Sequence, residues 1–327
     1  MTKLLKVHGS ENHFFILDQT QLKNQLSDNE LSNLARDITN PDNGVLGGAD
    51  GVLVVNHAGS QDALGQMRVI NADGSEASMC GNGLRTIARY LSEKHHQDQF
   101  KVETITANLD VSKQKDLADH VPAFSVEISP VKFNKEAFPF DHLETDQIMN
   151  RKILNFDPDL RFTAIALPNP HLISFVKNKN DFKKLGPLGK QLNGKNPYFP
   201  DGVNVSFAKI LGHNELFVQT YERGVGFTNA CGTGMSATSL AFLLNYPNDG
   251  DYDHIIKVKN PGGMVKTNVH HQNGKYWINL IGNATFTDVV DVDEDDLHNA
   301  DVSKNNVKIQ STGEENAYQK FVKTIKK

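Results

Sequence analysis

The chain repeats part of its own sequence at a constant spacing. Residues 79–84 (MCGNGL) match residues 230–235 (ACGTGM), and residues 50–54 (DGVLV) match residues 201–205 (DGVNV). Both pairs lie 151 positions apart, in the same order in each half of a 327-residue chain. Two unrelated matches at one spacing indicate a duplicated domain, because short glycine-containing words rarely recur together by accident. The sequence therefore predicts two halves of similar fold.

Each half is expected to combine several strands with one helix. A third, looser match pairs residues 12–16 with residues 169–173. Short apolar runs bounded by turn residues predict strands at 14–17, 52–55, 164–167 and 216–218. Apolar residues recur at helical spacing after each cysteine, at Leu84, Ile87, Ala88 and Leu91 and then at Ala237, Leu240, Ala241 and Leu244. This pattern predicts a mixed α/β (α+β) fold with a helix beginning just after each cysteine.

Composition excludes several classes of protein. The formal net charge is −5, which disfavours a nucleic-acid partner because binding phosphates requires a basic face. No apolar run is long enough to span a bilayer, and the N-terminus does not resemble a secretory signal, so no membrane association is expected. Two cysteines are too few for a disulfide scaffold, and a cytoplasmic location is the expectation.

The two cysteines carry the chemical hypothesis. A cysteine at a helix start meets the positive end of the helix dipole and unpaired backbone N–H groups, which favour the thiolate. The same N–H groups can hold a carboxylate. If duplicated halves face each other across a cleft, Cys80 and Cys231 would approach one substrate carbon from opposite sides. One thiolate would remove a proton while the other thiol delivers one, which inverts that carbon.

Other interpretations of the cysteines remain open at this point. A zinc site would need about four ligands, and neither a CxxC nor an HExxH spacing occurs, so no metal site is predicted. A cysteine protease would leave the second, matched cysteine unexplained. A dithiol redox sensor explains both cysteines but not the polar motifs around them. The dinucleotide and phosphate loops GxGxxG and GxxxxGK[ST] are absent.

Several motifs together resemble the diaminopimelate epimerase family. Residues 71–85 (NADGSEASMCGNGLR) resemble its signature, and further matching segments follow in family order at 8–14, 168–171, 201–205, 221–224, 230–234 and 260–263. The resemblance covers residues 8 to about 285. It implies two pseudo-symmetric halves, each with strands wrapped round a central helix, and an active site in the cleft between them. We expect the halves to be residues 1–128 with 286–327, and residues 129–285.

The resemblance also implies an activity. It implies a PLP-independent isomerase without a cofactor that interconverts LL- and meso-2,6-diaminopimelate, in lysine and peptidoglycan precursor biosynthesis. It also suggests a homodimer. The runner-up is a proline racemase or hydroxyproline epimerase on a similar scaffold, which would also use opposed cysteines.

Site residues follow from the matching motif positions. The resemblance makes Cys80 and Cys231 the acid/base thiols. Backbone N–H groups of Gly81, Asn82, Gly232 and Thr233 would hold the reacting α-carboxylate. The distal end of the substrate would be bound by Asn12, Asn71, Asn169, Asn204 and Arg223. Glu222 would bind the reacting end, and it would tune the thiol pKa values together with His171.

Two regions depart from the family pattern. Gly51 stands where many relatives have a substrate-contacting glutamine, so another group must replace that contact. The tail beyond about residue 290 lies outside the resemblance. Its acidic run at 291–296 predicts a solvated linker, and the helical spacing of Tyr318, Phe321, Val322 and Ile325 predicts a short docked helix.

Overall fold

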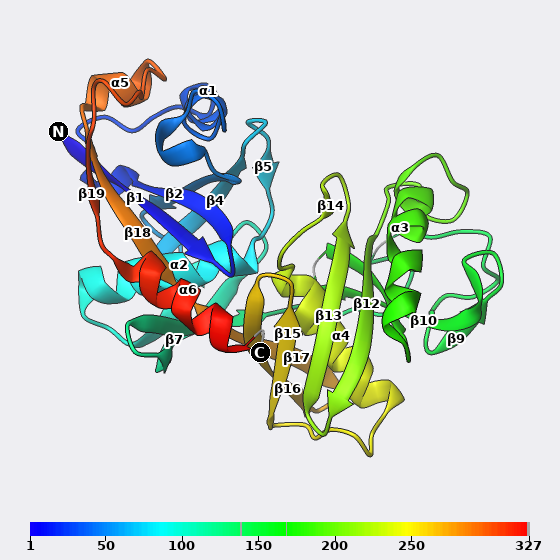
Figure 1. The fold of residues 1–327 in the computed structure, drawn as a ribbon. Helices are drawn as coiled ribbons and strands as arrows, with labels where there is room; N and C mark the ends of the chain where they lie inside the picture. The colour runs from blue at the N-terminus through cyan, green and yellow to red at the C-terminus, as the bar shows by residue number, and fades with distance from the viewer. Residues whose placement is uncertain (138, 168, 326–327) are drawn as a thin grey trace. The chain divides into compact units, whose positions relative to one another are not determined.

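The computed structural model describes residues 1–137, 139–167 and 169–325. It divides into two compact units (Figure 1). Unit one comprises Met1–Val126 and Ile281–Lys327, and unit two comprises Glu127–Leu280. Each unit mixes strands and helices, which confirms the α/β fold class predicted from the sequence.

Unit one is built on strands that pair both within and across the two chain segments. Its strands are β1 (Thr2–Gly9), β2 (Asn12–Asp18), β3 (Gly51–Asn56), β4 (Gly65–Asn71), β5 (Glu76–Ala77), β6 (Gln99–Glu103), β7 (Asn108–Ala118), β18 (Thr285–Val292) and β19 (Lys308–Ser311). β1 lies between β18 and β2, antiparallel to both. β2 then pairs parallel with β3, and β3 pairs antiparallel with β4.

Helix α2 (Gly81–His95) is the central helix of unit one. It contacts β1, β2, β3, β4 and β7, and most of its residues are buried (Figure 1). A second hydrophobic core joins α1 (Asp28–Ile38) and α5 (Glu294–His298) to β1, β2 and β3 through Phe15, Leu17 and Leu34. Successive residues of a strand point to opposite faces, so β2 can pack against α2 on one face and against the α1 and α5 core on the other.

Unit two repeats the same plan. Its strands are β9 (Arg151–Ile153), β10 (Asp157–Leu167), β11 (Asn169–Phe175), β12 (Asn204–Gly212), β13 (Glu215–Glu222), β14 (Gly226–Phe227), β15 (Ile255–Asn260) and β16 (Gly263–Gln272). The central helix is α4 (Gly232–Asn245), which contacts β10 to β13, β15 and β16. A separate core packs α3 (Leu185–Asn193) against β12 through Leu188, Leu192 and Phe207.

The remaining elements complete the chain. β8 (Val121–Ile128) and β17 (Lys275–Asn283) carry the chain from one unit to the other. Short 3-10 helices occupy Gln19–Gln21, Val45–Gly47 and Lys179–Lys184. In the part of the chain that the structure describes, no helix is long and apolar enough to cross a bilayer.

The pairing pattern confirms the internal repeat. In unit one, β2 runs parallel to β3, β3 antiparallel to β4, and β4 parallel to β6. In unit two, β11 runs parallel to β12, β12 antiparallel to β13, and β13 parallel to β15. The buried central helix, α2 or α4, comes directly before the last strand of each series, β6 or β15. The duplicated motifs therefore mark equivalent places in two copies of one topology.

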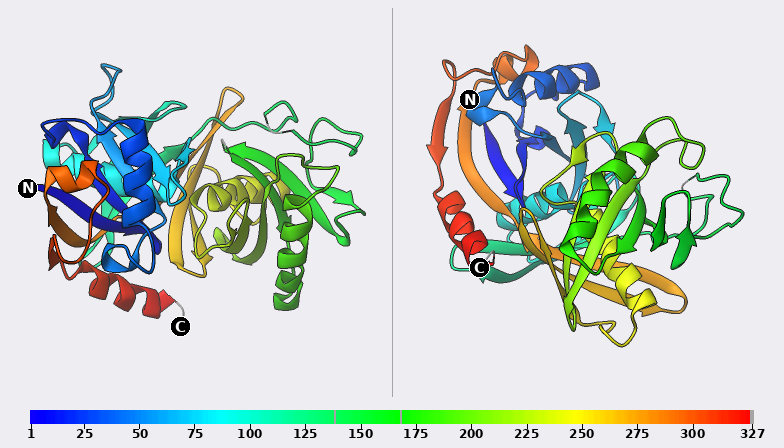
Figure 2. Two further views of the ribbon diagram at one scale, coloured as in Figure 1. Left: turned by 90° about the horizontal axis from the view of Figure 1, so that it is seen from above. Right: turned by 45° about the vertical axis from the view of Figure 1, so that its right-hand side comes forward.

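The tail differs in part from its prediction. The acidic run is not a solvated linker, because it forms the end of β18 and helix α5, where Val292 and Leu297 are fully buried. The predicted docked helix is confirmed as α6 (Glu314–Ile325), which buries Tyr318, Phe321 and Val322. α6 lies along β18 and β7 of unit one (Figures 1 and 2).

Candidate active site

Cys80 is the residue that starts helix α2. It has extended backbone dihedrals and occupies the N-cap position, and its sulfur accepts a hydrogen bond from the Gly83 N–H at 3.4 Å. A side chain at position 83 would collide with Leu53, so glycine lets the helix start pack directly on β3. The thiol therefore lies among the N–H groups of the first helical turn, where the helix dipole favours negative charge.

The Asp50 carboxylate orients the Asn12 side chain toward the Cys80 thiol. The thiol donates to Asn12 Oδ1 at 3.7 Å, and the Asn82 amide donates to the same oxygen at 3.2 Å. The Asn12 amide nitrogen donates to Asp50 Oδ2 at 2.6 Å, and the His13 backbone N–H donates to that oxygen at 2.8 Å. Asn12 thus has one orientation, with its oxygen toward Cys80.

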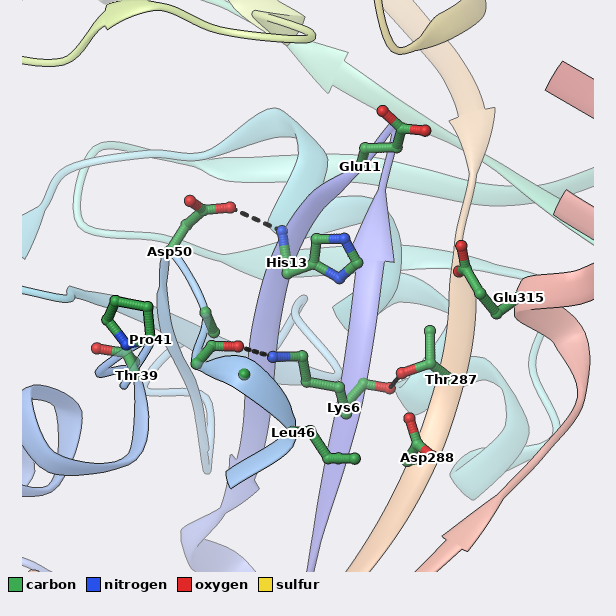
Figure 3. Close-up of a pocket in the computed structure, with 13 residues that line it drawn as sticks. Lys6, Glu11, His13, Thr39, Pro41, Leu46, Asp50, Thr287, Asp288 and Glu315 are labelled. Carbon is green, nitrogen blue, oxygen red and sulfur yellow. Dashed lines mark hydrogen bonds between the residues drawn. The ribbon is translucent and has the colours of Figure 1, made fainter. Parts of the chain in front are cut away.

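A cavity of about 650 Å³ lies beside this network (Figure 3). Its lining includes Asp50, His13 and Lys6. The Lys6 ammonium donates to the Gly48 carbonyl and lies 4.3 Å from the centre of the Phe15 ring. Burial lowers the pKa of Lys6 to about 8, although the charge of Asp50 opposes the shift.

Asn71 and Gly51 face each other across β3 and β4. Gly51 pairs with Asn71, and a Cβ at position 51 would lie 2.4 Å from the Ile70 carbonyl oxygen. A side chain at position 51 would therefore require β4 to move. The Asn71 amide donates to Ser75 Oγ at 3.0 Å in the turn that leads to β5.

Cys231 caps the start of helix α4 in unit two. It is buried, and its sulfur lies 3.7 Å from Thr233 Oγ1. Burial raises the pKa of the Cys231 thiol well above its usual value, and the negative charge of Glu222 adds to the rise. The Thr228 hydroxyl donates to the Glu222 carboxylate. Both effects favour the thiol form of Cys231 over the thiolate.

Two further predicted residues of unit two lie next to each other. Asn204, buried at the start of β12, accepts the Arg223 backbone N–H on its side-chain oxygen at 2.8 Å. The Arg223 guanidinium donates to the Asp201 carbonyl at 3.1 Å. These contacts fix the start of the loop after β13, directly beyond Glu222, the last residue of that strand.

His171 is a buried histidine with unmet hydrogen-bonding capacity. It pairs with Asn204 in the parallel register of β11 and β12 and is fully buried. Among the described residues, neither of its ring nitrogens has a hydrogen-bond partner. Burial lowers the pKa of His171 to about 3, and the charge of Arg223 contributes. A buried imidazole of this kind normally acquires a partner from a ligand or water.

The predicted site residues thus fall into two groups. In unit one, Cys80, Asn12 and Asn82 are in direct contact, whereas Asn71 bonds to its own turn. In unit two, the contacts join Asn204 with Arg223 and Cys231 with Thr233. Asn169 is the first residue of β11, as Asn12 is of β2, and the motif residue before it, Pro168, lies outside the described residues.

Sequence reasoning missed two residues that hold the site residues in place, Asp50 and Thr228. Asp50 belongs to the repeated Asp-Gly-Val segment, so the repeat itself was the available signal. Thr228 could be located only by its contact with Glu222. Within the ranges that the structure describes, no cluster of side chains suitable for a metal ion occurs.

Solved structures place the fold in one class. The chain is similar to a Bacillus anthracis phenazine biosynthesis protein of the PhzF family, with TM-score 0.64 and 15% identity, covering 88% of this chain and 97% of that one. It is also similar to a probable proline racemase from Agrobacterium radiobacter, with TM-score 0.58 and 14% identity, covering 90% and 94% of the two chains. At these identities the likeness concerns the fold alone.

Sequence comparison identifies the family. The family model for diaminopimelate epimerase matches residues 4–124 and 163–287. A diaminopimelate epimerase of Lactiplantibacillus plantarum is 51% identical over 99% of both chains, and one of Ligilactobacillus salivarius is 50% identical over 98% of both. The chain belongs to the diaminopimelate epimerase family. It is an isomerase, as the sequence analysis predicted.

Proposed function

We propose that the protein interconverts LL- and meso-2,6-diaminopimelate by inverting one α-carbon with two cysteines. The observation that carries the proposal is the equivalent position of Cys80 and Cys231. Each is the N-cap of the buried central helix of its own unit, at matching points of a duplicated topology. We also propose residues 1–128 with 286–327, and residues 129–285, as the two functional halves.

The proposed reaction exchanges one proton for another at the same carbon. A thiolate removes the Cα proton, so that a Cα–H bond breaks and an S–H bond forms. The opposite thiol then gives its proton to the other face of the carbon. One thiol and one thiolate are present before and after the reaction, so it involves no net redox change. Burial and the charge of Glu222 raise the pKa of Cys231 and so favour its thiol form, which would be the proton donor in one direction.

The reacting carboxylate is the second part of the proposal. First-turn N–H groups of a helix lack intrahelical partners and attract anions. We assign the N–H groups of Gly81 and Asn82 from α2, and those of Gly232 and Thr233 from α4, to this carboxylate. Such preorganised donors stabilise the negative charge that develops when the proton leaves. Acid–base transfer typically contributes only about 10²–10⁴-fold, so these donors must supply the larger share.

We assign the remaining polar residues to the rest of the substrate. The distal amino acid group would be bound by Asn12, Asn71, Asn169, Asn204 and Arg223. A doubly zwitterionic substrate needs many directed hydrogen bonds, and asparagine supplies both donors and an acceptor. Glu222 would bind the reacting end, and with His171 it would adjust the thiol pKa values. The His171 imidazole has a lowered pKa and no hydrogen-bond partner among the described residues, which fits a role that a ligand completes.

Solvent exchange tests substrate and mechanism together. Incubation of diaminopimelate with the protein in deuterium oxide should place solvent deuterium at Cα while the centre inverts. Cys80→Ala and Cys231→Ala should each abolish inversion while circular dichroism remains native. Near-normal turnover of either variant would contradict the two-base assignment. Inversion of proline or hydroxyproline instead of diaminopimelate would establish the sister activity, and reversible disulfide formation without any exchange would establish a redox sensor.

Three expectations accompany this function. We expect activity without added cofactor, a homodimer in solution, and a cytoplasmic location. Dialysis against a chelator followed by assay checks the first. Light scattering coupled to size-exclusion chromatography checks the second, with a mass twice that of the 36.3 kDa chain as the expected result.

A further inference from the structure

The turn that precedes Asn12 has an unusual backbone. Gly9 pairs with Asn12 at the end of hairpin β1–β2, so Ser10 and Glu11 form a two-residue loop. Their φ angles are 56° and 63°, as a type I′ turn requires. Asparagine and glycine are the usual residues here, because other side chains are crowded at positive φ. A turn of this kind persists where its surroundings hold it in place.

Two elements within the fold of unit one hold the first turn residue. The Ser10 backbone N–H donates to Asn283 Oδ1 at 2.8 Å. The Arg85 guanidinium donates to Ser10 Oγ at 3.2 Å and to the Asn283 carbonyl at 3.1 Å. All three side chains are fully buried. Arg85 belongs to α2, slightly more than one helical turn after Cys80.

The tail helix α6 holds the second turn residue through His8. The Glu11 backbone N–H donates to His8 Nδ1 at 3.3 Å, so His8 carries its proton on Nε2. That Nε2–H donates to Glu315 at 2.9 Å. Gln319 also donates directly to the Glu11 carboxylate at 3.3 Å. Glu11 and Glu315 lie around one pocket (Figure 3).

Tyr318 closes the contact between α6 and the turn. Its ring meets the His8 ring edge-on, with centroids 4.6 Å apart, and its hydroxyl hydrogen bonds to the Ser10 side chain. Tyr318 is almost completely buried. The hydrogen bond from His8 lowers the pKa of Glu315 to about 2, so this carboxylate is charged at neutral pH. Three side chains of α6 thus contact His8 and both residues of the turn.

We propose that helix α6 is a positioning element for the Cys80 half of the active site. Through Glu315, Tyr318 and Gln319 it holds the Ser10–Glu11 turn in its left-handed conformation. This turn fixes where β2 begins. It thereby keeps the Asn12 side-chain oxygen in contact with the Cys80 thiol. The catalytic consequence rests on the proposed function, whereas the effect on thiol reactivity does not.

The first test removes the contact between α6 and His8. In Glu315→Ala, the pH dependence of Cys80 alkylation by iodoacetamide should shift, as followed by peptide mass spectrometry. The same variant should lose about tenfold or more in kcat/KM for diaminopimelate, mostly through KM. Glu315→Gln keeps an oxygen that accepts from His8 and should recover most of the loss. Lys323→Ala, on the exposed side of α6, is the matched control and should match the wild type in both measurements.

A second variant separates positioning from general stability. Glycine adopts positive φ without steric penalty, so Glu11→Gly makes the turn less dependent on its contacts with α6. In the Glu315→Ala background, Glu11→Gly should restore Cys80 reactivity and bring kcat/KM to within about threefold of the wild type. A purely structural role of α6 would not respond in this way, because Glu11→Gly restores none of the lost helix contacts.

The outcomes distinguish this inference from the proposed function. Unchanged Cys80 alkylation in Glu315→Ala would overturn the inference. The inference would also be overturned if Glu315→Ala lowered the melting temperature and Glu11→Gly restored neither Cys80 alkylation nor kcat/KM in that background. If diaminopimelate is not a substrate at all, the alkylation measurements still decide the positioning role, and only the proposed function falls.

Discussion

Asp50 holds the Asn12 side-chain amide in one orientation. Its carboxylate accepts the Asn12 nitrogen at 2.6 Å, which turns the amide oxygen toward the Cys80 thiol 3.7 Å away. The same carboxylate oxygen also accepts the His13 backbone N–H. One charged side chain therefore fixes both the start of β2 and the polar group that meets the thiol.

Removing Asp50 should impair catalysis more than folding. Hydrogen bonds to charged groups contribute about 1.5–3 kcal/mol, so Asp50→Ala should lower kcat/KM by about 10- to 100-fold. Steady-state kinetics on diaminopimelate measure the effect. Asp50→Asn keeps one acceptor oxygen, so its kcat/KM should lie between those of the wild type and Asp50→Ala. The control is Asp42→Asn, an exposed position between α1 and β3, and wild-type kinetics for Asp50→Ala would refute the role of Asp50.

Neutralising Glu222 should make Cys231 more reactive. The negative charge of Glu222 helps to raise the Cys231 pKa, so Glu222→Gln should lower that pKa and increase the thiolate fraction at pH 8. The rate of Cys231 alkylation should therefore rise, even though turnover falls. Glu215→Gln, on the same strand β13, is the control. A slower or unchanged alkylation rate in Glu222→Gln would contradict the electrostatic coupling.

His171 should make the protein less stable in mild acid. Its pKa is about 3 in the folded state, against about 6.5 for an unfolded chain. Between these values the unfolded state binds a proton that the folded state does not, so the free energy of unfolding falls as pH drops below about 6.5.

His171→Asn removes this effect. The pH slope of the free energy of unfolding between pH 4 and 6 should decrease by up to about 1.4 kcal/mol per pH unit. Urea unfolding at several pH values measures the slope. His57→Asn, an exposed histidine, should keep the wild-type slope, and an unchanged slope in His171→Asn would show that the imidazole is protonated when folded.

Gly51 should not tolerate a side chain. Gly51→Ala would bring a Cβ against the Ile70 carbonyl and displace the strand that carries Asn71. We expect a loss of about 1–3 kcal/mol in stability, typical of overpacking, together with a higher KM. Thermal unfolding and kinetics check both. Gly212→Ala, where the added methyl group meets open space, should be neutral, and equal behaviour of the two variants would contradict the packing argument.

The sequence was most informative where one local rule decides the structure. The repeat and the apolar spacing after each cysteine predicted the helices that begin at Gly81 and Gly232, and the structure confirms both. These features depend on neighbouring residues, which a sequence displays directly. The same holds for α6, whose apolar spacing predicted a docked helix.

Contacts between distant segments could not be predicted in this way. Glu315 reaches His8 across 307 positions, and Arg85 reaches the Asn283 carbonyl across 198. The acidic run misled for a related reason, since Val292 and Leu297 are buried by partners far along the chain. Composition describes a segment, whereas burial depends on what the rest of the fold places against it.

Both central helices have a cysteine at the N-cap, and its sulfur is a weak hydrogen-bond acceptor. Serine, threonine, asparagine and aspartate satisfy first-turn N–H groups better than other residues do, by about 0.5–2 kcal/mol relative to alanine. Directed evolution for heat tolerance alone would therefore favour Cys80→Ser and Cys231→Ser. Under the proposed two-cysteine mechanism, the selected proteins would be more stable but inactive, because both stability and turnover would depend on the same two side-chain atoms.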